Sequence, residues 1–379
     1  MEQKKIVEDE EERCWSNLQI DILCIIKSHL FGSDRIRFHA VCKAWSSVPS
    51  QIAWLSSWES ENIPTEIIQF PSLMFLGRNT SVCNFFNPLA NTTYSKVIPD
   101  LANAKIWFSK DGWLLMTQGD VSIMFFNPFT NEKIHLPDLP MKEHKCNMIC
   151  FSSHPTSHNC LVLAIRIKSV NFIKFSWIRR GESTWTRFQD IYDEKFLIPC
   201  YSNPVFYNGA LHCLSHHGKL HIFDPGKVNT EDLWIVLDEV KIPPNRGRIK
   251  RCYLTVCDEE LVAVFEGHVG KTVDVFKLDR AAMGWKRVKE LGNRMLFVSL
   301  NGSVSVSARE KFHSGMQNKV YFPRFKGEDG IFYSLFTGKF HSFSNGYSAE
   351  DFYGTKEQVH CVWIQPNLEK QRVEELTWS

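Results

Sequence analysis

The sequence Phe85-Phe86-Asn87-Pro88-Leu89 recurs forty residues later as Phe125-Phe126-Asn127-Pro128-Phe129. Each copy is followed by a polar turn and then by an apolar residue with Pro-Asp-Leu, at 98–101 and 136–139. Weaker copies, in which a strand-like run leads to a later aromatic residue, begin at Phe175, Ile222, Val275 and Ile331. The chain therefore contains an internal repeat built from strands and turns.

The spacing of these copies predicts a ring of repeated sheets. Intervals of about 40 to 55 residues are typical of one four-stranded propeller blade, and the repeated part has room for about six or seven of them. The sequence has no Gly-Gly doublet of the kelch kind and no Trp-Asp repeat, so a propeller would be a divergent one. A single large β-sandwich or a pair of barrels remains the alternative.

Short apolar runs bounded by turn residues support this all-β interpretation. The predicted strands are 73–76, 113–117, 122–126, 148–151, 161–167, 172–178, 210–214, 220–223, 261–265, 273–278, 319–322, 331–335 and 359–364. Pairs that tolerate positive φ predict tight hairpins at Asp111-Gly112, Asn208-Gly209, Asn301-Gly302 and Asp329-Gly330.

The N-terminal region has a different periodicity. Leu18, Ile22, Ile25, Ile26 and Leu30 are spaced along one helical face. A second helical pattern begins after Ser33-Asp34 and, with a bend near Cys42, continues to Pro49. These patterns predict three helices in about forty residues, a unit so small that it rarely folds without a partner, metal or disulfide.

The predicted chain is an α+β, multidomain protein in which a small three-helix domain precedes a large all-β domain. The expected parts are a disordered acidic tail at 1–13, the helical domain at 14–55, a linker at 56–70, the propeller-like domain at 71–366 and a C-terminal tail at 367–379.

Composition narrows the classes of partner. Among 379 residues, 44 Lys and Arg stand against 42 Asp and Glu, so the formal charge of +2 creates no field that would attract nucleic acid or an anionic membrane. No apolar run reaches the length that crosses a bilayer, and the start of the chain lacks a hydrophobic signal region. The twelve scattered cysteines are typical of reduced thiols, so we expect the nucleus, the cytoplasm or both as the location.

The N-terminal pattern resembles a known motif. Trp15 to Leu23, followed by Ile26, Leu30, Arg37 and Val41-Cys42-Lys43-Ala44-Trp45, is similar to the F-box, whose pattern is Leu-Pro, then Leu or Ile pairs, then Val-Cys-Lys-x-Trp. Gln19 stands where the family has proline. The Phe-Asn-Pro turns, together with 329–335 and 341–343, resemble the KIB-type β-propeller that follows F-boxes in plants.

These resemblances imply a receptor without catalytic residues of its own. The F-box would bind the Skp-type adaptor of a cullin ubiquitin ligase, and the β-domain would bind an unknown target protein. The alternatives are a propeller enzyme, either an oxidoreductase or a hydrolase, and a carbohydrate- or protein-binding β-module with a vestigial F-box. No cofactor, metal, nucleic acid or membrane is expected as a ligand.

Adjacent apolar residues of one helix cannot all face inward, because neighbours diverge by about 100°. Some of this apolar surface is therefore available to the adaptor. The predicted adaptor-binding residues are Leu18, Ile22, Leu23, Ile26, Leu30, Val41, Cys42 and Trp45.

Other patterns are read as structural. His144, Cys146, Cys150, His154, His158 and Cys160 could ligate zinc, but they contain no Cys-x-x-Cys pair and are interpreted as core thiols and loop histidines. His212, Cys213, His216 and His217 are interpreted in the same way. The basic stretch 246–251 is predicted to be a solvated loop.

Overall fold

The structure is a computed structural model, and it describes residues 15, 18–20, 22–23, 26, 38, 40–46, 70–77, 81–169, 172–191, 202–214, 219–227, 234–237, 249–282, 284–308 and 315–378. The predicted acidic tail, nearly all of the predicted linker, Leu30, His216, His217 and 246–248 lie outside the described residues.

Five sheets contain four antiparallel strands each. The first, in spatial order, is β27 (Cys361–Ile364), β1 (Ser72–Leu76), β2 (Val82–Asn87) and β3 (Thr92–Val97). The second is β4 (Ala104–Lys110), β5 (Trp113–Gln118), β6 (Ser122–Phe126) and β7 (Lys133–His135). The third is β8 (Met148–Phe151), β9 (Leu161–Ser169), β10 (Phe172–Arg179) and β11 (Thr186–Ile191).

The fourth sheet is β12 (Val205–Tyr207), β13 (Ala210–Leu214), β14 (Leu220–Phe223) and β15 (Trp234–Leu237). The fifth is β16 (Ile249–Cys257), β17 (Glu260–Gly267), β18 (Val273–Asp279) and β19 (Gly284–Val288). A larger seven-stranded sheet is made of β20 (Arg294–Phe297), β21 (Val304–Ser307), β22 (Lys319–Lys326), β23 (Asp329–Ser334), β24 (Lys339–Ser342), β25 (Ser348–Ala349) and β26 (Lys356–Glu357).

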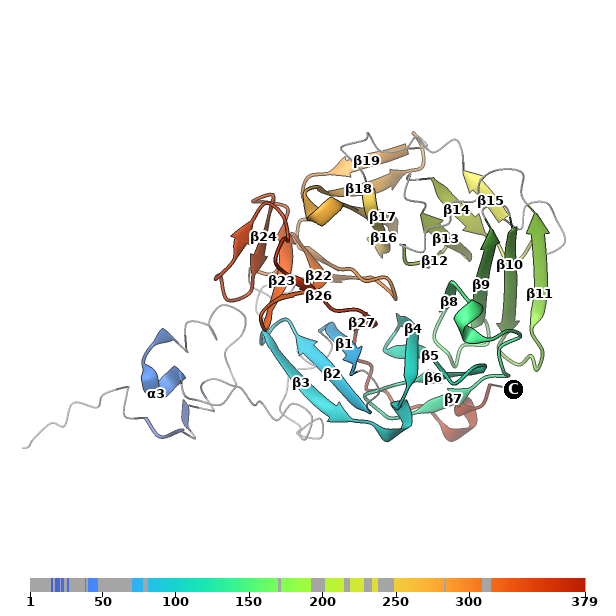
Figure 1. The fold of residues 1–379 in the computed structure, drawn as a ribbon, viewed down its shortest axis with the longest axis horizontal. Coiled ribbons are helices and arrows are strands. Elements are labelled where there is room, and N and C mark those ends of the chain that lie inside the picture. The colour runs from blue at the N-terminus through green and yellow to red at the C-terminus, as the bar shows by residue number, and fades with distance from the viewer. Residues whose placement is uncertain are drawn as a thin grey trace, which may run out of the picture.

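The sheets stand around a ring, each packed against the next (Figure 1). One apolar cluster joins the first and second sheets, and another joins the second, third and fourth. Two further clusters join the fourth to the fifth and the fifth to the seven-stranded sheet. A last cluster packs the seven-stranded sheet against the first. The fold is therefore a β-propeller, and a β-sandwich or a pair of barrels is excluded.

The two ends of the β-domain close this ring within one sheet. β27, near the C-terminus, pairs with β1 in antiparallel register, with Leu73 opposite Trp363 and Phe75 opposite Cys361. The same sheet therefore holds the first strand and the last, which removes an open edge from the ring.

The repeated Phe-Asn-Pro sequence ends the third strand of a sheet. The Asn87 side-chain oxygen accepts hydrogen bonds from the Leu89 and Ala90 amides at 2.8 and 3.2 Å. Asn127 does the same for Phe129 and Thr130 at 2.9 and 3.3 Å. Asp224 ends β14 in a similar turn, with its carboxylate accepting from the Gly226 amide. The repeat encodes the buried turn that leads to the outermost strand.

The sequence predicts most of the strands but not every turn. Each predicted run overlaps a strand, and Asp111-Gly112 and Asn208-Gly209 form two-residue hairpins in which all four residues have positive φ. The prediction of a turn at Asp329-Gly330 is wrong, because both residues lie in β23 and pair across to β22. The hairpin between β16 and β17 was missed, since its positive-φ residues are Asp258 and Glu259 rather than Asn or Gly.

The prediction of an α+β fold with a three-helix domain is wrong. The described residues are nearly all β, and the one α-helix that can be bounded among them is α3 (Lys43–Ser46). The remaining helical elements are the short 3₁₀ turns η2 (Pro99–Leu101), η3 (Glu143–Lys145), η5 (His268–Gly270) and η6 (Val373–Leu376). No helix in this described part is long and apolar enough to cross a membrane.

Residues 366–378 run along the second and third sheets. Asn367 is in close contact with Gly112, whose positive φ and lack of a Cβ allow the approach. The Gln371 amide donates to Glu132 at 2.8 Å, and the Gly181 amide donates to the Trp378 carbonyl at 3.0 Å. The Trp378 ring is buried against Phe125, with ring centroids 5.8 Å apart.

Candidate functional site

The described N-terminal residues form a small apolar core of their own. Leu23 and Phe38 are each 2% exposed, and Leu18, Ile26 and Trp45 pack around them. The Phe38 and Trp45 rings lie 4.6 Å apart, and the Trp45 indole donates to the Trp15 carbonyl at 3.0 Å. In Figure 1 α3 lies outside the ring of sheets. This core is much smaller than any in the propeller.

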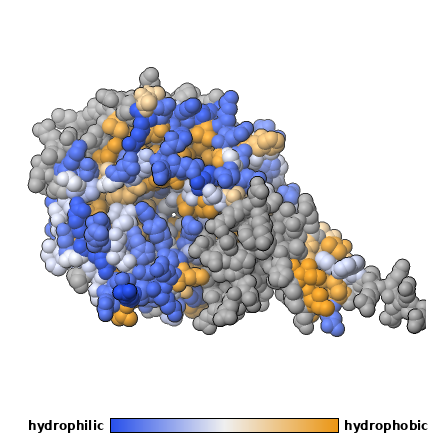
Figure 2. All heavy atoms as spheres, turned by 180° about the vertical axis from the view of Figure 1, so that it is seen from behind, coloured by the Kyte–Doolittle hydropathy of each residue, from blue (hydrophilic) through white to orange (hydrophobic). Residues whose placement is uncertain are grey.

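Large apolar side chains remain on the surface of the same region. Trp15 is 70% exposed, Ile20 52%, Ile22 42% and Val41 56%. Figure 2 shows hydrophobic residues gathered on the part that projects from the ring. We call Trp15, Ile20, Ile22 and Val41 the N-terminal apolar surface. Exposed apolar side chains gathered in this way are typical of a site that binds another protein.

The predicted adaptor-binding residues divide between these two groups. Leu18, Leu23, Ile26 and Trp45 belong to the small core, whereas Ile22 and Val41 are exposed. Cys42 is half-buried. Trp15 and Ile20, which are exposed, are not among the predicted adaptor-binding residues. Which apolar side chains face outward depends on the packing around Phe38.

A second candidate is the cavity on the propeller axis, of about 210 Å³. It is lined by residues at or beside the strands β4, β12, β16, β21 and β27, including Lys110, Phe206, Thr255, Ser303 and Trp363. Lys110 and Asp111 are its titratable lining residues, and the Lys110 ammonium donates to the Ser152 carbonyl at 2.5 Å. The cavity therefore offers hydroxyl, aromatic and aliphatic groups beside one lysine and one aspartate.

Three of the residues considered for zinc, Cys146, Cys160 and His154, occupy structural positions. Burial raises the pKa of the Cys146 thiol to about 11 and that of Cys160 to about 12, so neither is readily ionised. The Trp113 indole donates to His154 Nε2 at 2.9 Å, and His154 Nδ1 lies 2.8 Å from the Thr156 hydroxyl. No group of three possible ligands capable of holding a metal occurs among the described residues.

A charged cluster lies buried between the fifth sheet and the seven-stranded sheet. Burial raises the pKa of Glu266, which accepts a hydrogen bond from the Tyr253 hydroxyl at 2.9 Å. Arg251 and Arg324 both pair with Glu357. The prediction that 246–251 is a solvated loop is therefore wrong for residues 249–251, which lie in β16.

The chain is similar to plant F-box proteins. An F-box/kelch-repeat protein of Arabidopsis thaliana is 28% identical over 361 residues, which cover 93% of this chain and 94% of that protein. An F-box protein of the same plant is also 28% identical, over 326 residues covering 84% and 82%.

Among solved structures, a quinonprotein alcohol dehydrogenase-like protein from Bacteroides thetaiotaomicron is 10% identical with a TM-score of 0.38, covering 78% of this chain and 77% of that one. The family model described as the KIB1-4 β-propeller matches residues 85–348, which is more than half of the chain. The chain belongs to the KIB1-4 β-propeller family.

Proposed function

We propose that this protein is the substrate-recognition subunit of an SCF-type ubiquitin ligase, in which a Skp-type adaptor binds the N-terminal apolar surface and the propeller binds a target protein. The observation that carries the proposal is that Trp15, Ile20, Ile22 and Val41 are exposed beside a core with two fully buried side chains. The names of the plant relatives support it, because both are called F-box proteins.

Apolar side chains left in water cost free energy, which a partner that covers them recovers. Burial of a large aliphatic side chain contributes about 1.5–3 kcal/mol, so several of them covered by one partner can account for docking. The same contact would stabilise an N-terminal region whose own core is small. An apolar surface of this kind suits an apolar groove on the partner.

In this role the protein forms and breaks no covalent bond itself. It holds a target lysine near a ubiquitin-charged conjugating enzyme, and the high effective concentration accelerates transfer. The rigid ring of sheets presents its connecting loops to the target. We place this activity in the nucleus or cytoplasm, which a fluorescent fusion would test.

An adaptor pull-down with charge substitutions in the N-terminal apolar surface tests the proposal. Ile22→Asp together with Val41→Asp places two carboxylates in the contact, and we expect capture of a plant Skp-type adaptor to weaken by about 100-fold or more. The matched control is Val359→Asp, since Val359 is 51% exposed but lies in the propeller domain. Trp45→Ala is a poorer choice, because it would remove part of the small core.

The pull-down distinguishes a wrong function from a wrong binding surface. If the wild-type chain captures no adaptor, the ligase function is wrong. If the double variant captures adaptor as well as the wild type does, the protein binds adaptor through another surface.

A further inference from the structure

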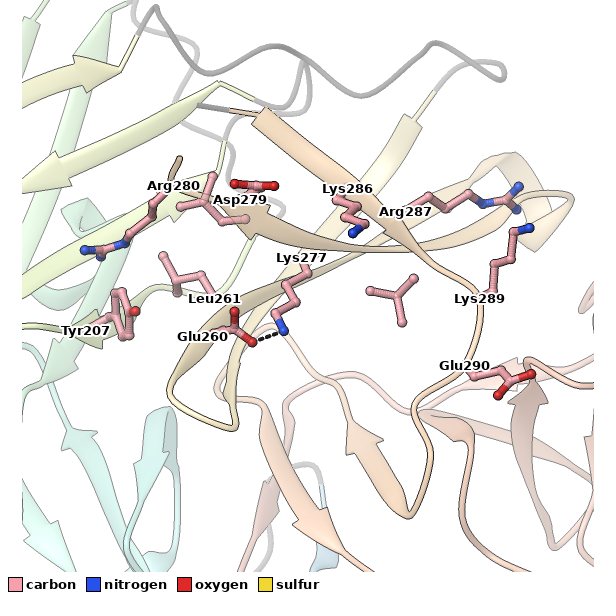
Figure 3. A pocket seen from close by; sticks show the side chains of 12 residues that line it. Tyr207, Glu260, Leu261, Lys277, Asp279, Arg280, Lys286, Arg287, Lys289 and Glu290 are labelled. Atoms are coloured by element: carbon pink, nitrogen blue, oxygen red, sulfur yellow. Dashed lines mark ion pairs between the residues drawn. The ribbon is translucent and has the colours of Figure 1, made fainter. Parts of the chain in front are cut away.

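The fifth sheet carries a basic cavity at its outer strands. It has a volume of about 570 Å³ and is bordered by the start of β17, the end of β18, the last three residues of β19 and the two residues that follow β19. Five cationic side chains line it: Lys277, Arg280, Lys286, Arg287 and Lys289 (Figure 3). We call these five residues and the cavity between them the β19 groove. Glu260, Asp279 and Glu290 are its acidic lining residues.

Two of the five cations have a carboxylate partner and three do not. Lys277 pairs with Glu260, and Arg287 pairs with Asp274 at 2.5 Å. The Arg280 guanidinium lies 4.9 Å from the centre of the Tyr207 ring. Within the described part of the chain, no carboxylate forms an ion pair with Arg280, Lys286 or Lys289. Asp279 and Glu290 also line the cavity, so among the described residues the five cationic side chains exceed the three lining carboxylates and the β19 groove is net basic.

The strand register also brings two like charges together, which destabilises the pairing of β18 with β19 locally. Lys277 of β18 stands directly opposite Lys286 of β19. Like charges at opposed positions of an antiparallel pair repel each other and destabilise it. Glu260 compensates Lys277 only, so an anion from outside the chain would relieve the repulsion on Lys286.

β19 is also the last strand of its sheet among the described residues, and it pairs with β18 alone. An edge strand presents backbone amides and carbonyls to which an extended peptide can add as a further strand. The outermost strands of the other four-stranded sheets, β3, β7, β11 and β15, contain at most one Lys or Arg each. β19 contains Lys286 and Arg287 and is followed at once by Lys289.

We propose that an extended segment of the target protein, rich in glutamate and aspartate, docks in the β19 groove. This inference rests on the proposed function and names the chemical class of the target segment. Carboxylates at alternate positions of the added strand would face Lys286 and the neighbouring cations. Lysines on a sheet edge also prevent edge-to-edge aggregation, but a charge of either sign does that. Recognition of an acidic segment requires positive charge.

The test is the binding of a fluorescein-labelled peptide of alternating glutamate and threonine to the intact chain, followed by fluorescence anisotropy. We expect binding that weakens as NaCl rises from about 0.05 to about 0.5 M, because salt screens exposed charges. The matched peptide of glutamine and threonine should not bind. Lys286→Glu with Lys289→Glu should weaken binding about tenfold or more. Lys286→Gln with Lys289→Gln should weaken binding by a smaller factor. This milder variant keeps the test interpretable if the charge-reversed protein misfolds.

The control variant is Lys339→Glu with Lys356→Glu, which reverses two exposed lysines on strands of the seven-stranded sheet and should bind like the wild type. The proposal is overturned if the glutamate peptide does not bind, if reversal in the β19 groove leaves its affinity unchanged, or if single-stranded oligothymidine competes with equal affinity. Adaptor capture by the same variants should be unchanged. A loss of peptide binding with adaptor capture intact concerns the target site alone, whereas absent adaptor capture would contradict the proposed function.

Discussion

The propeller and the N-terminal region bury their apolar residues in different ways. In the propeller each sheet packs between two others, and β5 and β13 are buried along almost their whole length. The described N-terminal residues bury two side chains fully and expose four large apolar ones. The propeller is therefore stabilised by a large core of its own, whereas the N-terminal region has only a small core and is the region for which we propose a partner.

The largest effect is expected when one core residue from each region is truncated and the losses of stability are compared. Phe125→Ala removes a fully buried ring that packs on Phe151 at 4.9 Å, and it should lower the free energy of unfolding of the propeller by about 3–5 kcal/mol. Leu23→Ala should leave the propeller transition unchanged and weaken adaptor capture. Chemical denaturation followed by tryptophan fluorescence measures the first, and the pull-down measures the second. Equal shifts in the unfolding transition would mean that the two regions unfold as one unit.

A somewhat smaller effect is expected at low pH, where the propeller should lose stability because of one buried histidine. Burial lowers the pKa of His212 to about 4, below its ordinary value of 6.5. The folded protein therefore favours the neutral His212 ring. The contribution of the neutral ring to the free energy of unfolding is complete above pH 6.5 and is lost as the pH falls towards 4. The total loss is up to about 3 kcal/mol. His212→Gln should flatten this part of the stability profile, whereas the exposed His144→Gln should leave it unchanged. A profile that is the same in all three proteins would contradict the assignment to His212.

The two copies of the repeat give a finer comparison inside the propeller. Asn127 caps its turn and also donates to the Asn367 carbonyl at 3.0 Å, whereas Asn87 has the two capping bonds. Asn127→Ala should lower the free energy of unfolding by about 2–3 kcal/mol and Asn87→Ala by about 1–2 kcal/mol, because each leaves buried or partly buried amides without their acceptor. Thermal unfolding of the two variants in parallel shows which of them is destabilised more. The reverse order would mean that the contact with Asn367 contributes little to stability.

The sequence predicted the β-domain better than the N-terminal region for a physical reason. A strand in a propeller is defined by local apolar runs and turn residues, so β6, β8, β13 and β14 were located with their observed bounds. The function of Asn87 and Asn127 was not predictable, because a side-chain cap depends on where the following amides turn. β3 was not located, because it is mostly polar and half-exposed at the edge of its sheet.

The N-terminal prediction was limited by the small number of constraints in a short segment. Apolar periodicity indicated a helical face and therefore a three-helix domain, which is not what the described residues show. It could not separate Leu23, which is buried, from its neighbour Ile22, which is exposed. The β19 groove was not predictable either, because Lys277 and Lys286 are brought together by strand register rather than by sequence spacing.

Hydrogen–deuterium exchange of the intact chain, with and without a Skp-type adaptor, is the most direct test of the proposed adaptor site. We expect the adaptor to slow amide exchange across residues 15–46 and to leave exchange in the propeller strands, including β19, unchanged. Slower exchange confined to the propeller, or no change anywhere at saturating adaptor, would contradict the claim that the N-terminal apolar surface is the adaptor site.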